Sequence, residues 1–130
     1  MDFDHIGIVV EDLDNGKELI SELFPIASFS DEIIDNNINV KIIFATDTSN
    51  IRYELIAPLN ENSPVSGALK ARKNIINHVA YRTQDFDNTV STYNKHSLQL
   101  GPPCPAVAFD NKRVVFFMTR LGAIVELIEQ

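Results

Sequence analysis

Two histidines and two glutamates give this 130-residue sequence its clearest chemical signal. His5 and His78 lie 73 positions apart (78 − 5), and Glu54 and Glu126 lie 72 positions apart (126 − 54). Imidazole nitrogens and carboxylate oxygens together suit a divalent first-row metal and leave coordination sites for water or substrate. The four residues therefore predict a metal centre, provided that the fold brings them together.

An internal repeat relates these residues to one another. At a nearly constant offset, three pairs of segments align: residues 3–8 with 76–81, residues 12–15 with 85–88, and residues 53–56 with 125–128. The repeat superimposes His5 on His78 and Glu54 on Glu126. One register shared by a strand, a turn and a later strand indicates two copies of one structural unit.

Each copy is predicted to fold as β-α-β-β-β, which makes the fold class α+β. In the first copy, Asp12 or Asp14 can cap a helix that ends near Leu23. The predicted strands of this copy are residues 3–10, 26–30, 38–46 and 51–57. The second copy is predicted to contain a strand at 75–83, a helix at 86–96, and strands near 106–109, 113–119 and 123–128.

The whole chain, residues 1–130, is predicted to form one domain. The first module covers residues 1–60, a linker with a short helix from Val65 to about Arg72 covers 61–73, and the second module covers 74–130. The pair Asp110-Asn111 predicts a hairpin turn within the second module.

Side-chain alternation predicts where the histidines point. His5 and His78 lie on the strand face opposite to the helix, and each is followed two residues later by a small residue, Gly7 or Ala80. Glu126 lies in the apolar strand 123–128, so its carboxylate is expected to be buried and to need a partner or a metal.

A pseudo-twofold axis between the copies would bring the four side chains together. The alternative is that His5–Glu54 and His78–Glu126 are polar pairs that line a cavity and bind no ion. One histidine considered alone is more often a hydrogen-bonded structural residue than a ligand. The repeat favours the metal centre because equivalent residues of two copies gather around their common axis.

Other polar residues carry weaker signals. Cys104 lies between prolines without a visible activating partner, and His96 follows a polar helix end that is expected to be exposed. Lys70, Arg72 and Lys73 predict a solvated helix face or a phosphate contact. The sequence contains neither a glycine-rich phosphate-binding motif nor a Gly-x-Ser-x-Gly motif.

Composition argues against several classes of partner. The net charge is −7, from 11 Lys and Arg against 18 Asp and Glu, which disfavours nucleic acid and anionic membranes. A single cysteine excludes an intramolecular disulfide, and no apolar run approaches the roughly 20 residues of a membrane span. The acidic start of the chain differs from a basic signal peptide. We therefore expect a cytoplasmic protein.

The segments that contain the four residues resemble the vicinal oxygen chelate superfamily, which includes glyoxalase I, bleomycin resistance proteins and extradiol dioxygenases. Within it, the sequence is most similar to methylmalonyl-CoA epimerases. The matching segments are residues 4–10, 54–59, 62–65, 77–82 and 125–127. The resemblance implies a glyoxalase-like fold, in which two βαβββ modules form a cupped mixed sheet. It also implies metal ligands at His5, Glu54, His78 and Glu126, with Co, Ni, Zn, Mn or Mg as the ion.

Three segments differ from the epimerases. Residues 108–112 replace a Gly-rich loop, and residues 118–121 replace a His-Pro-Lys segment. Lys41 stands where some epimerases have a second acidic residue. Because these elements shape the substrate pocket and supply proton transfer in that family, the acyl group of the substrate is left open.

The resemblance implies an isomerase or epimerase that removes a proton next to a carbonyl, on an acyl-CoA-type thioester. Glu126 is expected to move the proton, with Glu54 as the second choice. The alternatives are a glyoxalase I-type enzyme acting on a thiol adduct and a non-catalytic module that binds a small molecule. An extradiol oxygenase is disfavoured because those chains are usually longer. The resemblance and the apolar sheet edges also predict a homodimer.

Overall fold

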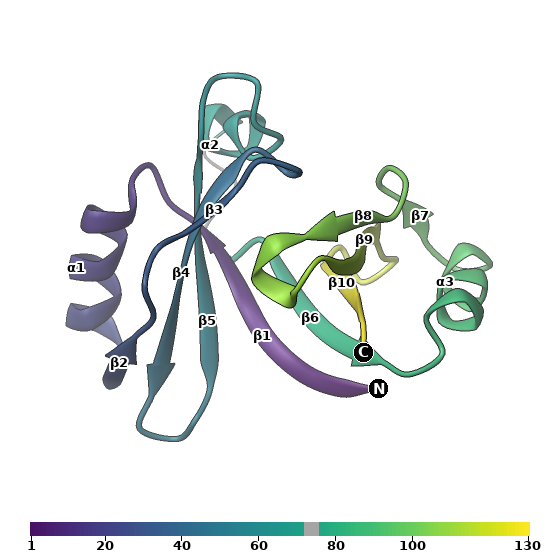
Figure 1. Cartoon of the computed structure of the whole chain (residues 1–130), viewed down its shortest axis with the longest axis horizontal. Helices are drawn as coiled ribbons and strands as arrows, with labels where there is room; N and C mark the ends of the chain where they lie inside the picture. Colours follow the sequence, from purple (N-terminus) through teal and green to yellow (C-terminus); the bar gives the residue numbers. More distant parts are fainter. Residues whose placement is uncertain (72–75) are drawn as a thin grey trace.

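A curved mixed sheet forms the centre of the protein (Figure 1). The computed structural model describes residues 1–71 and 76–130. The elements in chain order are β1 (Asp2–Val9), α1 (Leu13–Leu23), β2 (Ile26–Phe29), β3 (Ile33–Asp35), β4 (Val40–Asp47), β5 (Arg52–Pro58), α2 (Ser66–Ala71), β6 (His78–Thr83), α3 (Phe86–Asn94), β7 (Leu98–Gln99), β8 (Cys104–Ala106), the 3-10 helix η1 (Val107–Phe109), β9 (Lys112–Met118) and β10 (Ile124–Glu129). Within these ranges, no helix is long and apolar enough to cross a membrane.

The strand order is β2-β4-β5-β1-β6-β10-β9-β7, with β3 beside β4 and β8 beside β9. In each half, the first and last strands of the unit pair in parallel, β1 with β5 and β6 with β10. The two halves meet where β1 and β6 pair antiparallel. This arrangement confirms the α+β fold of two βαβββ modules and relates the modules by an approximate twofold axis between β1 and β6.

The second strand of each module is broken into two short pieces. Both β2 and β3 pair with β4, and both β7 and β8 pair with β9. Neither β3 nor β7 is predicted from the sequence, because segments of three and two residues are too short to show a period. The predicted strand at residues 106–109 is wrong.

The strand ends at Ala106 and the chain turns into η1, where the backbone N–H of Val107 donates to Asp35 Oδ2 at 2.9 Å. The predicted turn at Asp110 and Asn111 is present, with φ angles of 56° and 60°. Both residue types tolerate this left-handed conformation.

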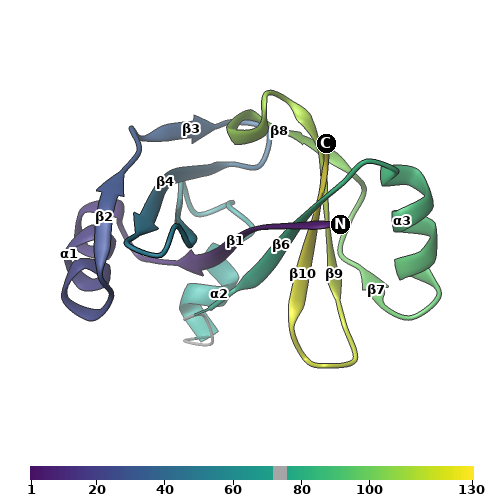
Figure 2. The same ribbon diagram turned by 90° about the horizontal axis from the view of Figure 1, so that it is seen from below.

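Helices α1 and α3 lie on the outer sides of the two halves (Figures 1 and 2). Helix α1 begins after Asp12, which accepts a hydrogen bond from the backbone N–H of Asn15, so Asp12 and not Asp14 is the cap. Its buried residues Leu13 and Ile20 pack against apolar residues of β4 and β5. Helix α3 has the equivalent cap at Asp85 and ends at Asn94, two residues earlier than predicted.

Helix α2 joins the halves at Ser66–Ala71, inside the predicted linker. Residue 72, the predicted end of this helix, and residue 75, the predicted start of the next strand, lie outside the described residues. The described part of that strand begins later, at His78.

The concave side of the sheet carries a separate apolar cluster. It includes Val40, Ile42 and Phe44 from the first module and Phe109, Val114 and Ile128 from the second. The cluster therefore joins the modules around the hollow that they enclose, and any side chain placed at the centre of the sheet on this side is shielded from water.

Asp35 holds η1 of the second module against the first. Its side chain is fully buried and accepts hydrogen bonds from the backbone N–H groups of Asn37, Ile38 and Val107. We expect Asp35→Asn to lower the free energy of unfolding by about 1–3 kcal/mol, because the amide nitrogen that replaces Oδ2 cannot accept the hydrogen bond from Val107. Urea denaturation monitored by circular dichroism measures the change.

Asp31→Asn, at an exposed position, is the matched control and is expected to leave stability unchanged. Equal stability of the Asp35→Asn and Asp31→Asn variants would show that the Asp35 carboxylate does not hold the modules together.

Candidate metal centre

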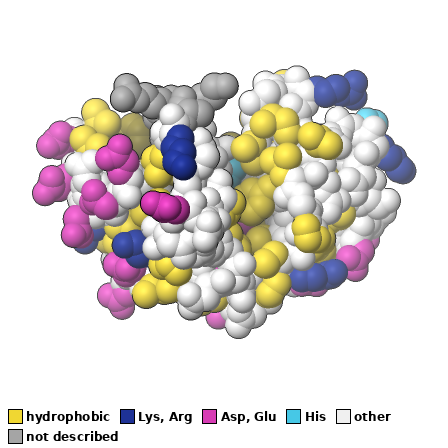
Figure 3. All heavy atoms as spheres, turned by 90° about the horizontal axis from the view of Figure 1, so that it is seen from above, with side chains coloured by type: hydrophobic (Ala, Val, Ile, Leu, Met, Phe, Trp, Pro, Cys, Tyr) yellow, Lys and Arg dark blue, Asp and Glu magenta, His cyan; other side chains and the backbone are white. Residues whose placement is uncertain are grey.

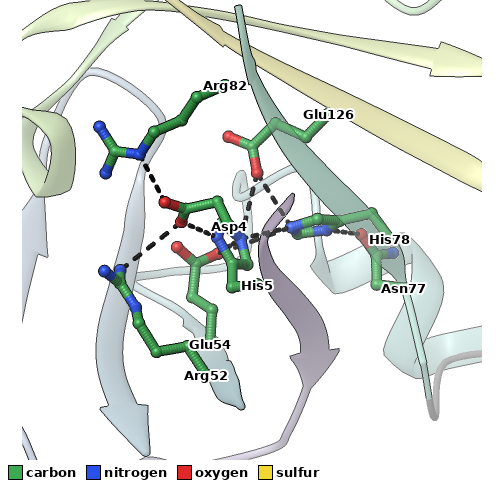
Figure 4. A network of polar contacts seen from close by, with 8 residues as sticks. All are labelled: Asp4, His5, Arg52, Glu54, Asn77, His78, Arg82 and Glu126. Carbon is green, nitrogen blue, oxygen red and sulfur yellow. Dashed lines mark hydrogen bonds and ion pairs between the residues drawn. The ribbon is translucent and has the colours of Figure 1, made fainter. Parts of the chain in front are cut away.

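The four residues singled out by the repeat meet at the centre of the sheet (Figure 4). Their ligand atoms all lie within 4.8 Å of one another, and all four residues are buried: His5, Glu54, His78 and Glu126. The Nε2 atoms of His5 and His78 are 3.1 Å apart. Glu126 Oε2 lies 3.3 Å from His5 Nε2 and 3.0 Å from His78 Nε2, whereas Glu54 Oε1 is farther away, at 3.7 and 3.8 Å.

Four adjacent strands position these side chains in two rows. In one row, Gly7 of β1 pairs with Glu54 of β5 on one side and with His78 of β6 on the other. In the second row, Ala80 of β6 pairs with His5 and with Glu126. Each row therefore places one histidine and one glutamate on either side of a small residue.

The two small residues make room for the histidine of the opposite module. A Cβ atom on Gly7 would lie 2.1 Å from Cε1 of His78. Ala80 lies opposite His5 in the symmetric position. The predicted space beside each small residue is present, but it accommodates the histidine of the other module, across the twofold axis.

The charges of the cluster compensate one another. Burial disfavours a charge on His5, but the carboxylates of Glu54, Asp4 and Glu126 outweigh it and raise the His5 pKa to about 10. Burial raises the pKa of Glu54. Burial opposes ionisation of Glu126 as well, but contacts with the two histidines lower its pKa. A positive charge between the four side chains is therefore favoured.

The donor atoms fit a divalent cation. His5 Nδ1 lies 2.7 Å from Asp4 Oδ2, and His78 Nδ1 lies 2.9 Å from Asn77 Oδ1, so both Nδ1–H groups donate outward. In the neutral form that metal coordination requires, the two imidazoles would direct their Nε2 lone pairs at each other across 3.1 Å. Among the described residues, buried Glu126 Oε2 finds no hydrogen-bond donor. Lone pairs that face one another in this way need a cation between them.

A pocket of about 610 Å³ opens from this cluster into the hollow between the modules. Glu54, His78 and Glu126 lie at its base. The walls are mainly apolar and the rim contains amides, and Figure 3 shows hydrophobic side chains along the hollow. The pocket can therefore enclose a ligand that is apolar along most of its surface.

The other candidate residues stay outside the cluster. Lys41 alternates with Val40 and Ile42, which line the pocket, so the lysine lies on the opposite face of β4. His96 is exposed. Cys104 lines the pocket, but burial raises its pKa, which keeps it a thiol. Of the predicted basic group, Lys70 lies in α2, while residues 72 and 73 are outside the described part.

Sequence reasoning missed the residues that surround the cluster. Asp4 and Asn77 contact the histidine rings, Arg52 and Arg82 contact Asp4, and Phe109 stacks on His5 at 5.8 Å. The repeat contained a signal for two of them, because Asp4 and Asn77 directly precede the paired histidines.

The paired modules and the buried His–Glu cluster are features of a known class of protein, which comparison of this chain with known protein families identifies. Residues 4–116 match the Glyoxalase/Bleomycin resistance protein/Dioxygenase superfamily. The chain belongs to this superfamily.

Individual relatives are more distant. The uncharacterized protein YqjC of Bacillus subtilis is 26% identical over 129 residues, covering 97% of this chain and 90% of that protein. The methylmalonyl-CoA epimerase of Mycobacterium tuberculosis has a TM-score of 0.80 at 24% identity, covering 98% of this chain and 87% of its own. A Streptomyces coelicolor methylmalonyl-CoA epimerase in complex with 2-nitronate-propionyl-CoA has a TM-score of 0.80 at 22% identity, covering 100% and 94%. These structures share the fold of this chain.

His5→Ala and His78→Ala are each expected to weaken binding of Co²⁺, Ni²⁺ or Zn²⁺ by more than about 100-fold, beyond the loss typical for residues that only support a ligand. The fold is expected to persist, because apolar clusters on both sides of the sheet do not depend on an ion. Isothermal titration of untagged protein measures affinity and stoichiometry. The control is exposed His96→Ala, and wild-type affinity in His5→Ala would contradict the four-residue centre.

Gly7→Ala is expected to displace the His78 ring, because the added Cβ would overlap it. Overpacking of this kind costs about 1–3 kcal/mol, and metal affinity should fall with it. Gly67→Ala in α2 is the matched control, since its Cβ would meet nothing within 4 Å. That change should be neutral or stabilise the helix by about 0.5–1 kcal/mol. Identical melting temperatures of both variants would refute the close contact.

Proposed function

We propose that this protein is a metal-dependent isomerase or epimerase that removes a proton next to a carbonyl group. The observation that carries the proposal is the buried cluster of two imidazoles and two carboxylates at the base of an apolar pocket. A divalent ion held by His5, Glu54, His78 and Glu126 would polarise the substrate oxygens as a Lewis acid.

Glu126 is our first candidate for the group that accepts the proton. Glu126 lines the pocket, and its buried Oε2 has no hydrogen-bond donor among the described residues. Glu54 is the second candidate, since it lines the same base and burial raises its pKa. A substrate that fills this mainly apolar pocket would displace water, which would strengthen electrostatic stabilisation of the negative charge that forms on it.

An acyl-CoA thioester is the substrate class that we propose. The apolar walls suit an acyl chain, and the similar Streptomyces coelicolor epimerase is in complex with a propionyl-CoA derivative. No Lys or Arg is among the described residues that line the pocket, so the phosphates of a CoA ester would lie outside it.

A glyoxalase I-type isomerisation is the second candidate, favoured by the chemistry of the pocket walls. Inversion of a centre requires a proton to leave one face and return to the other. Among the described lining residues, the carboxylate away from the base is Asp35, which is already committed to three backbone N–H groups. These pocket walls therefore favour a reaction in which a single carboxylate at the base both removes the proton and returns it.

We further propose that the protein is a homodimer. Large hydrophobic side chains are exposed at the β9–β10 turn and near β7, including Leu121, Leu98 and Leu100. Exposed apolar surface of this kind is typical of an interface. A sedimentation profile with monomer alone at high micromolar concentration would contradict the dimer.

Deuterium uptake from D2O tests the chemistry. Metal-loaded protein is expected to exchange the acidic proton of methylmalonyl-CoA, or that of the methylglyoxal–glutathione hemithioacetal, faster than metal-free protein. Glu126→Gln should slow exchange by about 100-fold or more, because an amide does not accept a proton at neutral pH. Glu54→Gln should have a smaller effect. Exposed Glu61→Gln is the control, and NMR spectroscopy follows the exchange.

The substrate that exchanges decides between the candidates. Exchange of the thioester supports the epimerase, and exchange of the hemithioacetal alone supports the glyoxalase-type isomerase. If neither exchanges while metal is bound, the proposal of proton abstraction on these substrates is wrong, and a binding module becomes the better interpretation.

A further inference from the structure

The residues that precede the two histidines hold equivalent positions but differ in chemistry. The repeat aligns Asp4 with Asn77, and each contacts the ring of the histidine that follows it (Figure 4). Asp4 Oδ2 lies 2.7 Å from His5 Nδ1, and Asn77 Oδ1 lies 2.9 Å from His78 Nδ1. One ring therefore donates to a carboxylate and the other to an uncharged amide.

Local backbone irregularity makes both contacts possible. In a regular strand, neighbouring side chains point to opposite faces, so Asp4 could not reach the ring of His5. The register between β1 and β6 shifts between Phe3 and His5, which makes Asp4 the extra residue of a bulge. Asn77 precedes the first residue of β6 and is likewise free of strand alternation. Bulges commonly redirect a side chain beside a functional site.

The carboxylate of Asp4 is held more firmly than the amide of Asn77. Arg82 Nε donates to Asp4 Oδ1 at 2.6 Å, and a guanidinium nitrogen of Arg52 lies 3.6 Å from Oδ2. The Asp4 side chain is only 6% exposed. These contacts leave its second oxygen directed at His5 Nδ1.

Aromatic rings fix the same network from outside. The guanidinium groups of Arg52 and Arg82 lie over the rings of Phe44 and Phe109, at 4.2 and 5.5 Å. Both aromatic rings also pack against His5. His5 therefore has little freedom to rotate.

We propose that Asp4 and Asn77 are positioning residues that direct the Nε2 lone pairs of His5 and His78 into the cluster, and that the carboxylate makes His5 the stronger metal donor. A carboxylate that accepts the Nδ1–H of a ligating imidazole fixes its tautomer and increases its basicity. An amide fixes the tautomer with less electron donation. This inference rests on the proposed metal-dependent function, and it assigns unequal roles to two symmetric ligands.

Metal titration of variants at both positions tests the proposal. Asp4→Ala should weaken Zn²⁺ binding by about 10–100-fold, the usual effect of losing such a partner. Asn77→Leu should weaken binding by about three- to tenfold, because hydrogen bonds to an uncharged acceptor are about half as strong. Asn77→Asp should keep the acceptor, add a negative charge to it and bind Zn²⁺ at least as tightly as wild type.

Matched controls separate positioning from general destabilisation. Asp12→Asn is the same carboxylate-to-amide change at the exposed cap of α1, where both residues cap well, and it should leave Zn²⁺ affinity unchanged. If Asp4→Ala does not fold, Asp4→Asn keeps the size of the side chain and should bind with intermediate affinity. Affinity within about threefold of wild type in both Asp4 variants would overturn the proposal.

Long-range ¹H–¹⁵N NMR spectra of the histidine rings give a readout independent of activity. Wild type should show a protonated Nδ1 on both rings, in the metal-free and the Zn²⁺-loaded protein. Asn77→Leu should change the His78 ring alone, and Asp4→Asn the His5 ring alone. A wild-type ring protonated on Nε2 and not on Nδ1 would overturn the positioning role. If wild type binds no Zn²⁺, Co²⁺ or Ni²⁺ but both Nδ1 atoms are protonated, the proposed function fails while the tautomer assignment stands.

Discussion

The antiparallel contact between β1 and β6 is the constraint on which the site depends. The strands must approach closely enough for Gly7 to lie against the His78 ring, and a Cβ at position 7 would remove that space. The same pairing sets Ala80 opposite His5. Because β5 and β10 extend the sheet on either side, their glutamates enter the same two rows. The distances within the cluster thus follow from sheet register.

Burial makes the cluster energetically costly. Two carboxylates and two imidazoles lie away from water at the base of the pocket, where an unpaired charge is strongly disfavoured. The structure compensates locally: the histidines face the carboxylates, and the outer ring nitrogens donate to Asp4 and Asn77. Glu126 Oε2, which finds no hydrogen-bond donor among the described residues, is directed inward, toward the point that a cation would occupy.

The approximate symmetry of the modules brings the four residues of the cluster together. Departures from this symmetry give equivalent residues different surroundings. The modules place equivalent residues around one axis, but Asp4 carries two arginine contacts that Asn77 lacks among the described residues. Asp35 of the first module binds η1 of the second and so holds Phe109 near His5. A ligand in the pocket would therefore meet two different walls, although the sheet beneath them repeats.

Sequence alone determined the repeat, the α+β class and the identity of the four clustered residues, because strand alternation is a local property and the aligned register of the two copies can be read without the structure. It also indicated that Glu126 is buried. Only the tertiary structure decided which small residue faces which histidine, that Lys41 lies off the pocket, and that Asp4 reaches the ring beside it. These features depend on pairing between strands distant in the chain and on a bulge, and neither leaves a periodic pattern in the sequence.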